Sequence, residues 1–221
     1  MAQKSVTTNL ESSPFLQHHS ASLRIWHWLT FLFITGSIVT VLFNSTLLSP
    51  RENIKLVQEQ LSRKGVAVTD DQAFAVSHEY EDKMWDVHKL IGYGVALLLL
   101  ARVIIEFTLP EDERMRNRFK KAMSMSKQNT ENSMEYKHYI RVKLTYTIFF
   151  ILLFLMALTG LGMAFGRELG FSRDLHRSLK NLHAIIQYLM YAFIVVHLAG
   201  VIIAENGRIK GIVSGMINGN D

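Results

Sequence analysis

Residues 182–204 read LHAIIQYLMYAFIVVHLAGVIIA, a run whose only members of the Asp, Glu, Lys, Arg and His group are His183 and His197. A helix needs about 20 apolar residues to cross a bilayer. The fourteen residues from His183 to His197 make about four helical turns, or about 21 Å. Both imidazoles therefore leave one helix face at two depths. Ionisable side chains are costly in hydrocarbon and usually mark cofactor sites or proton paths. The run therefore predicts a membrane helix that carries two metal centres.

Three further apolar runs stand at 25–42, 90–105 and 144–165, and among them only the second contains a charged residue, Arg102. With flanking residues, the four runs predict transmembrane helices at about 22–43, 86–107, 141–165 and 180–205. The expected fold is an all-α membrane protein, a four-helix transmembrane bundle, with residues 1–221 as a single membrane domain.

The chain contains no cysteine. Disulfides, thiolate metal sites, iron–sulfur ligation and the covalent attachment of c-type haem are therefore excluded. Any haem in this protein is expected to be held non-covalently.

The basic residues are unevenly placed along the chain. With four crossings, the termini and the basic loop at 107–143 fall on one side, which together with Arg102 collects 14 of the 24 Lys and Arg residues. Positively charged segments favour the cytoplasm, so both termini are predicted to be cytoplasmic in a bacterial inner membrane. Contact with lipid explains the basic loop better than nucleic-acid binding does, so no nucleic-acid partner is expected.

Two polar segments connect the predicted helices. The outer segment 44–84 has apolar spacing at Ile54, Val57 and Leu61, which predicts a short amphipathic helix, with a solvated loop as an equal alternative. The segment 108–138 is rich in Arg, Lys and Met and is predicted to be a partly helical, basic connector in the cytoplasm.

Two more histidines match the first two in depth. His27 stands at the inner end of the first helix and His88 at the outer end of the second, so the alternating helix directions pair His27 with His197 and His88 with His183. Each couple could hold one haem iron from opposite sides, an arrangement suited to electron transfer. A lone membrane histidine often serves packing or hydrogen bonding instead, but four at paired depths favour metal binding.

Several short motifs surround these histidines. They are Arg24-x-x-His27-Trp28 followed by Thr35-Gly36, His88 with Gly92 four residues on, and His183-x13-His197. In these motifs the chain resembles the bacterial di-haem cytochrome b family. That family includes the cytochrome b561 proteins and the haem subunits of nickel–iron hydrogenases and membrane formate dehydrogenases. The likeness covers all four helices, and the long segment at 43–84 is its main departure.

The resemblance implies a bundle that binds two b-type haems, the inner held by His27 and His197 and the outer by His88 and His183. It implies electron transfer between the quinone pool, with quinone as substrate, and a hydrogenase, a dehydrogenase or a c-type cytochrome. Whether the chain is itself the quinone-reactive subunit of an oxidoreductase complex stays open.

Other residues are candidates for contact with the haems. Arg24 and Arg102 lie at the inner level and are expected to bind the inner haem propionates, with snorkelling to the interface as the alternative. Gly36, Gly92 and Gly200 are expected to face a haem, because a flat macrocycle needs close backbone approach, although helix packing alone also explains glycines.

A different class of function remains open from the residues. A four-helix transporter or assembly subunit could use the histidines to relay protons or to bind zinc or copper. That alternative predicts a colourless protein, whereas the cytochrome hypothesis predicts a strong Soret band.

Overall fold

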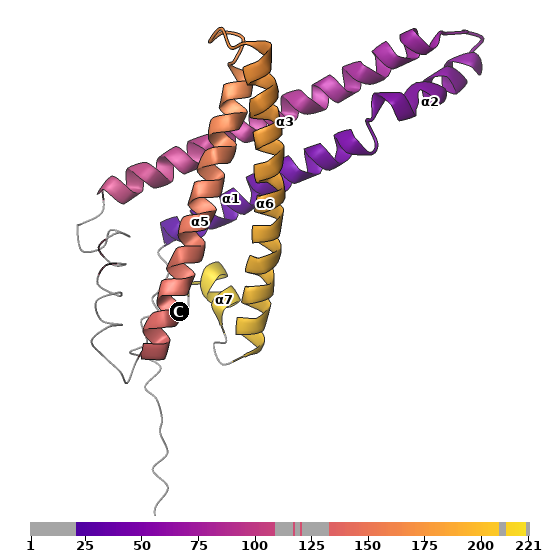
Figure 1. Cartoon of the computed structure of the whole chain (residues 1–221). Coiled ribbons are helices and arrows are strands. Elements are labelled where there is room, and N and C mark those ends of the chain that lie inside the picture. The colour runs from indigo at the N-terminus through magenta and orange to yellow at the C-terminus, as the bar shows by residue number, and fades with distance from the viewer. Residues whose placement is uncertain (1–20, 109–116, 118–119, 121–132, 208–210, 220–221) are drawn as a thin grey trace, which may run out of the picture. The chain divides into compact units, whose positions relative to one another are not determined.

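The computed structural model describes residues 21–108, 117, 120, 133–207 and 211–219, with the backbone alone for 133–143. These residues form α-helices and no strand (Figure 1). The helices are α1 (Ala21–Ser45), α2 (Pro50–Ser62), α3 (Asp70–Thr108), α5 (Ser133–Ala164), α6 (Arg173–Asn206) and α7 (Ile212–Ile217).

Four segments have the length and apolar character of membrane spans. They are Ala21–Ser45, Asp70–Thr108, Leu144–Ala164 and Arg173–Asn206. Large apolar side chains on them face outward, such as Leu97 at 66% exposure and Ile203 at 73%. Exposure of such large apolar surfaces to water would be unfavourable, whereas their contact with lipid is not. The prediction of an all-α membrane bundle with four crossing helices is confirmed.

Helix α3 begins well before the residue 86 expected from the apolar run. Thr69 and Gln72 form a reciprocal capping box, because Thr69 N donates to Gln72 Oε1 at 2.9 Å and Gln72 N donates to Thr69 Oγ1 at 3.3 Å. Asp70 and Asp71 add negative charge to the first turn, where the helix dipole favours it. Local capping therefore starts a helix that apolar content alone does not reveal.

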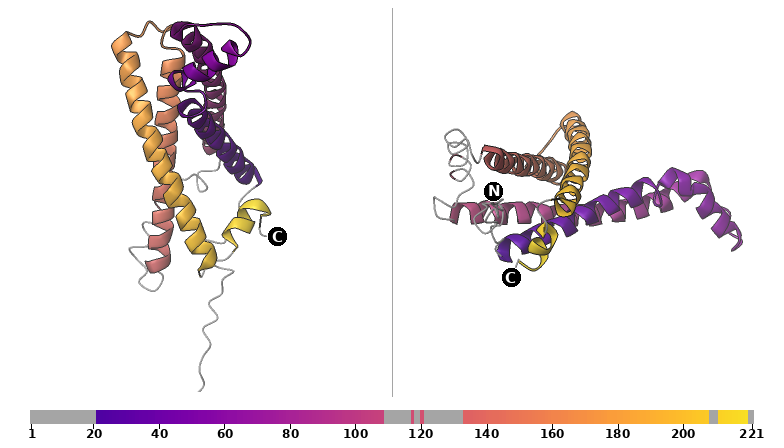
Figure 2. Two further views of the ribbon diagram at one scale, coloured as in Figure 1. Left: turned by 90° about the vertical axis from the view of Figure 1, so that its right-hand side faces the viewer. Right: turned by 90° about the horizontal axis from the view of Figure 1, so that it is seen from below.

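The outer segment forms a second helix rather than a solvated loop. Pro50 starts α2 at the first helical position, where its missing N–H costs nothing. Helix α2 lies beside the first part of α3 (Figure 2), and Gln58 Nε2 donates to Asp70 Oδ1 at 2.7 Å. Much of the basic connector expected at 108–138 lies outside the described residues, and its last residues belong to α5.

The chain divides into two compact units, and the boundaries cut across helices. We call them the first unit, which is Met1–His27 with Ile105–Ile151 and Leu189–Asp221, and the second unit, which is Trp28–Ile104 with Leu152–Tyr188. Each unit thus takes part of several helices, and each has its own core.

In the second unit, α1 and α3 pack antiparallel. A Cβ added at Gly94 would lie 2.0 Å from Phe33 Cε1, and one at Gly36 would lie 3.4 Å from Ile91 Cδ1. Further along the same interface, Asn44 Nδ2 reaches the carbonyl oxygen of Glu81 at 3.5 Å. The glycines therefore bring the two helices close and fix their register.

Helices α5 and α6 pack antiparallel in the same unit. A Cβ at Gly162 would lie 3.2 Å from Leu179 Cδ1. The rings of Tyr93 on α3 and Phe165, just after α5, stack at 5.8 Å. This stack joins the α1–α3 pair to the α5–α6 pair within the second unit.

The first unit has an aromatic core. Trp26 is 7% exposed and stacks on Phe150 at 5.4 Å between ring centres. Tyr146 meets the edge of Phe150 at 4.6 Å, and Phe149 lies 5.2 Å from Phe193 on α6. These rings hold α1, α5 and α6 together around the start of α1.

Candidate functional site

The four predicted histidines are distributed as two couples. His27 and His197 belong to the first unit, and His88 and His183 belong to the second. Each unit therefore contains one complete couple, in the combination expected from depth along the helices.

The first couple has the spacing of two ligands on one metal ion. The ring centres of His27 and His197 lie 6.5 Å apart, with 57° between the ring planes. An imidazole nitrogen binds a transition metal at about 2 Å and lies about 1 Å from its ring centre, so two rings on one ion have centres about 6 Å apart. The separation of these two ring centres is therefore close to the one that a single shared ion requires.

The ring of His197 is stacked on a phenylalanine. Phe193, one turn earlier on α6, lies parallel to it at 6.0 Å with 5° between planes. Phe193 in turn contacts Phe149 of α5. Apolar packing thus restricts the rotation of the His197 ring.

The second couple is held by hydroxyl groups from neighbouring helices. Thr40 Oγ1 lies 2.8 Å from His88 Nδ1, and Ser37 Oγ lies 3.4 Å from the same nitrogen. Thr159 Oγ1 lies 2.8 Å from His183 Nδ1. In both histidines the second nitrogen, Nε2, is left for a different partner.

The glycines expected at the site have different surroundings. A Cβ at Gly92 or at Gly200 would meet no atom within 4 Å, so each leaves open space about one turn beyond His88 or His197. Gly36 instead contacts Ile91 in the α1–α3 interface. Gly160 also belongs to the site, because a Cβ there would lie 3.4 Å from His183 Cε1.

The two arginines expected at the inner level lie in different units. Arg24 is in the first unit, where its guanidinium lies against Gly219 at the end of the described chain. Arg102 is half-buried on α3 and belongs to the second unit. Their contact with propionates stays a prediction.

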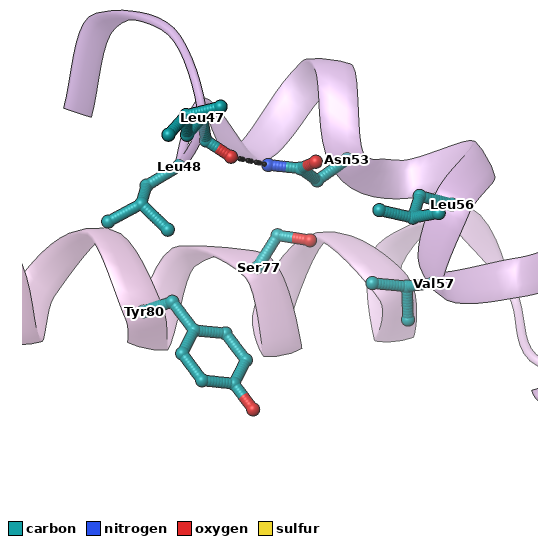
Figure 3. Close-up of a pocket in the computed structure, with 7 residues that line it drawn as sticks. All are labelled: Leu47, Leu48, Asn53, Leu56, Val57, Ser77 and Tyr80. Carbon is teal, nitrogen blue, oxygen red and sulfur yellow. Dashed lines mark hydrogen bonds between the residues drawn. The ribbon is translucent and has the colours of Figure 1, made fainter. Parts of the chain in front are cut away.

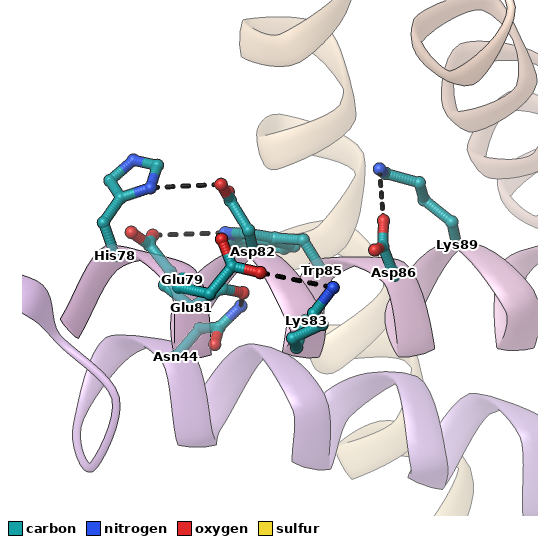
Figure 4. A network of polar contacts seen from close by, with 9 residues as sticks. All are labelled: Asn44, His78, Glu79, Glu81, Asp82, Lys83, Trp85, Asp86 and Lys89. Atoms are coloured by element: carbon teal, nitrogen blue, oxygen red, sulfur yellow. Dashed lines mark hydrogen bonds and ion pairs between the residues drawn. The ribbon is translucent and has the colours of Figure 1, made fainter. Parts of the chain in front are cut away.

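Helix α2 and the polar first part of α3 form a hairpin, here called the outer hairpin, and a polar network on that part of α3 includes Trp85 (Figure 4). Trp85 meets the ring of His88 edge-on at 5.5 Å, and its Nε1 donates to Glu81 Oε1 at 3.1 Å. Glu81 also accepts the bond from Asn44 through its backbone. The contact with Trp85 therefore restricts the rotation of the His88 ring, and Trp85 is itself held by the polar first part of α3.

A shallow pocket of about 290 Å³ lies between α2 and α3 (Figure 3). Its lining is mostly apolar and comes from the second unit: Leu47, Leu48, Asn53, Leu56, Val57, Ser77 and Tyr80. No histidine of the two couples lines it. The pocket belongs to the outer hairpin rather than to the candidate site.

Thr40, Thr159 and Trp85 were not expected from the sequence as parts of the site. Threonine in a membrane helix usually bonds to its own backbone and gives no signal of its own. A tryptophan near the end of a membrane helix is typical of an interfacial belt. Only the pairing of helices shows which histidine each threonine contacts, whereas Trp85 lies three residues before His88 on the same helix, α3.

Among the described residues, no group of three or more His, Asp, Glu or Cys side chains could hold a metal ion. A porphyrin supplies four ligands itself and needs only two from the protein, so couples suffice for haem. A family model described as prokaryotic cytochrome b561 matches residues 18–219. Neither the comparison with curated proteins nor that with solved structures found a match.

Proposed function

This chain belongs to the prokaryotic cytochrome b561 family, and from that premise we propose that it holds two b-type haems, one between His27 and His197 and one between His88 and His183. Family membership and the four apolar helices make it a membrane-integral protein that transfers electrons through haem b. It contacts lipid and exchanges electrons with partners. A bound haem supplies a reversible one-electron change at its iron.

The residues present fit this cofactor. The 6.5 Å separation of the His27 and His197 rings is the observation that carries the proposal, because it matches two imidazoles on one ion. The open space beside Gly92 and Gly200 is what close approach of a flat macrocycle requires. The Nδ1 contacts of His88 and His183 leave Nε2 available for iron.

The electrons are proposed to pass between the quinone pool and a hydrogenase, a dehydrogenase or a c-type cytochrome. A chain embedded in lipid meets quinone there, and the outer hairpin of α2 and α3 offers a surface close to Trp85 and His88 for a partner. In the proposed orientation, both termini lie in the cytoplasm of a bacterial inner membrane and the hairpin lies outside.

Substitution of the four histidines tests the ligand assignment. We expect His27→Ala, His88→Ala, His183→Ala and His197→Ala each to lose about one haem per polypeptide, because one protein ligand no longer holds the iron. The measurement is a pyridine haemochrome assay on the full chain purified in detergent. His78→Ala is the control, since His78 is exposed and pairs with Asp82 at 3.1 Å on the hairpin.

The unmodified protein is expected to carry two haems and a strong Soret band. Full haem content in a purified His183→Ala protein would contradict the assignment of that ligand. A colourless wild-type protein that still binds zinc or copper would favour a metal-handling or proton-relay function instead.

A further inference from the structure

Two buried threonines contact the His88–His183 couple in the same way. Thr40 is 4% exposed and Thr159 is 2% exposed, and each places its hydroxyl 2.8 Å from the Nδ1 atom of a histidine on the neighbouring helix. Thr40 on α1 contacts His88 on α3, and Thr159 on α5 contacts His183 on α6. The same threonine–histidine contact therefore occurs twice, and its four residues lie on four different helices.

The direction of the Thr159 bond follows from its second contact. Thr159 Oγ1 lies 2.7 Å from the carbonyl oxygen of Leu155 and 3.2 Å from that of Met156, so the hydroxyl hydrogen is donated to the backbone of its own helix. A hydroxyl has one hydrogen to donate. Toward His183 the oxygen therefore accepts, and the hydrogen of that bond belongs to Nδ1.

The same argument applies to Thr40. Its Oγ1 donates to the carbonyl oxygen of Ser37 at 2.7 Å, so it accepts from His88 Nδ1. An imidazole that carries its hydrogen on Nδ1 has a free electron pair on Nε2. Both histidines are thus held in the form in which Nε2 binds a metal.

We propose that Thr40 and Thr159 are positioning residues that fix the tautomer and ring orientation of His88 and His183 and thereby hold the outer haem and lower its midpoint potential. This inference rests on the proposed function, in which His88 and His183 would hold the haem iron. Donation of a hydrogen bond from the far nitrogen makes an imidazole a more basic ligand. A more basic ligand favours the ferric iron, which lowers the potential.

The two haems of one protein give an internal reference. His27, His197 and the Phe193 ring that stacks on His197 belong to the first unit, whereas Thr40 and Thr159 belong to the second. Changes at Thr40 or Thr159 should therefore alter one of two haem signals and leave the other where it was.

The experiment compares valine and serine at each threonine. Thr159→Val and Thr40→Val keep the shape and remove the hydroxyl, whereas Thr159→Ser and Thr40→Ser keep the hydroxyl. Thr46→Val is the matched control, because Thr46 Oγ1 donates to the carbonyl oxygen of Leu42 and is exposed. Full-length proteins in detergent are measured for haem per polypeptide and for both midpoint potentials by optical redox titration.

For the valine variants we expect reduction of one haem to become about threefold to tenfold more favourable, which is about 30 to 59 mV for one electron. We also expect that haem to dissociate at least about tenfold more readily, as for other changes beside metal ligands. The serine variants should return both quantities to the wild-type values, and Thr46→Val should change neither.

Each possible result either supports or overturns the inference about Thr40 and Thr159. Loss of one haem from a valine variant supports the inference if the serine variant retains it, and overturns it if serine loses it equally. Unchanged potentials and full haem in both valine variants overturn it. If one valine variant does not accumulate, the other threonine gives the same test at the other histidine. Retention of both haems by His88→Ala and His183→Ala would refute the ligand assignment itself.

Discussion

At the scale of single residues, the glycines separate into two functions. Gly94 and Gly36 bring α3 and α1 together, because an added Cβ would contact Phe33 or Ile91. Gly92, only two residues from Gly94, borders open space. Neighbouring glycines on one helix therefore serve packing on one face and, in our proposal, cofactor approach on another.

We expect Gly94→Ala to destabilise the protein by about 1–3 kcal/mol, since the added Cβ would overlap the Phe33 ring. The readout is a lower midpoint of thermal unfolding in detergent. The double change Gly94→Ala with Phe33→Leu should recover part of the loss. Leu97→Ala serves as control, because Leu97 is 66% exposed. An unchanged midpoint in Gly94→Ala would contradict the close packing of α1 on α3.

At the scale of elements, helix α3 consists of two parts that differ in composition. Its later part has the apolar composition of a membrane span, whereas its first turns are polar and packed against α2. Ala73 is fully buried and Ser77 is 3% exposed, on the face where the pocket residues of α2 lie. Small side chains on that face allow α2 to approach α3 closely.

Ala73→Leu should therefore detach α2 from α3. The larger side chain has no space on the buried face, so we expect much faster amide hydrogen exchange in Pro50–Ser62, with haem content unchanged. Ala75→Leu is the matched control, since Ala75 is exposed on the same helix. Equal protection of α2 in the two variants would show that Ala73 does not hold it.

At the scale of the whole molecule, the four spans and the basic residues set the proposed orientation. Four crossings place both termini on one side. That side has more of the 24 Lys and Arg residues than the other, and positive charge favours the cytoplasm. The outer hairpin then faces the opposite compartment.

Single cysteines can test this orientation cleanly, because the chain contains none. Gln60→Cys on α2 and Asn218→Cys after α7 introduce thiols at two exposed positions, which the proposed orientation places on opposite sides of the membrane. We expect a membrane-impermeant maleimide to label Gln60→Cys in intact spheroplasts and Asn218→Cys only after lysis. The reverse pattern would invert the orientation.

Much of the fold follows from the sequence because the signals are local. The lengths of the apolar runs place four membrane helices, and the interval between His183 and His197 puts both on one face of α6. The early start of α3 was missed because its capping box and its acidic first turn lie in a polar segment, where hydropathy gives no signal.

The sequence by itself determined the fold class, the number of crossings and which histidines can share a depth, since length, polarity and helical period are properties of contiguous residues. Only the tertiary structure decided that Thr40 meets His88 and that Thr159 meets His183. In each of these two contacts, the threonine and the histidine are 24 or more positions apart in the sequence. They depend on which helices pack together and in what register, and side-chain packing between helices fixes both.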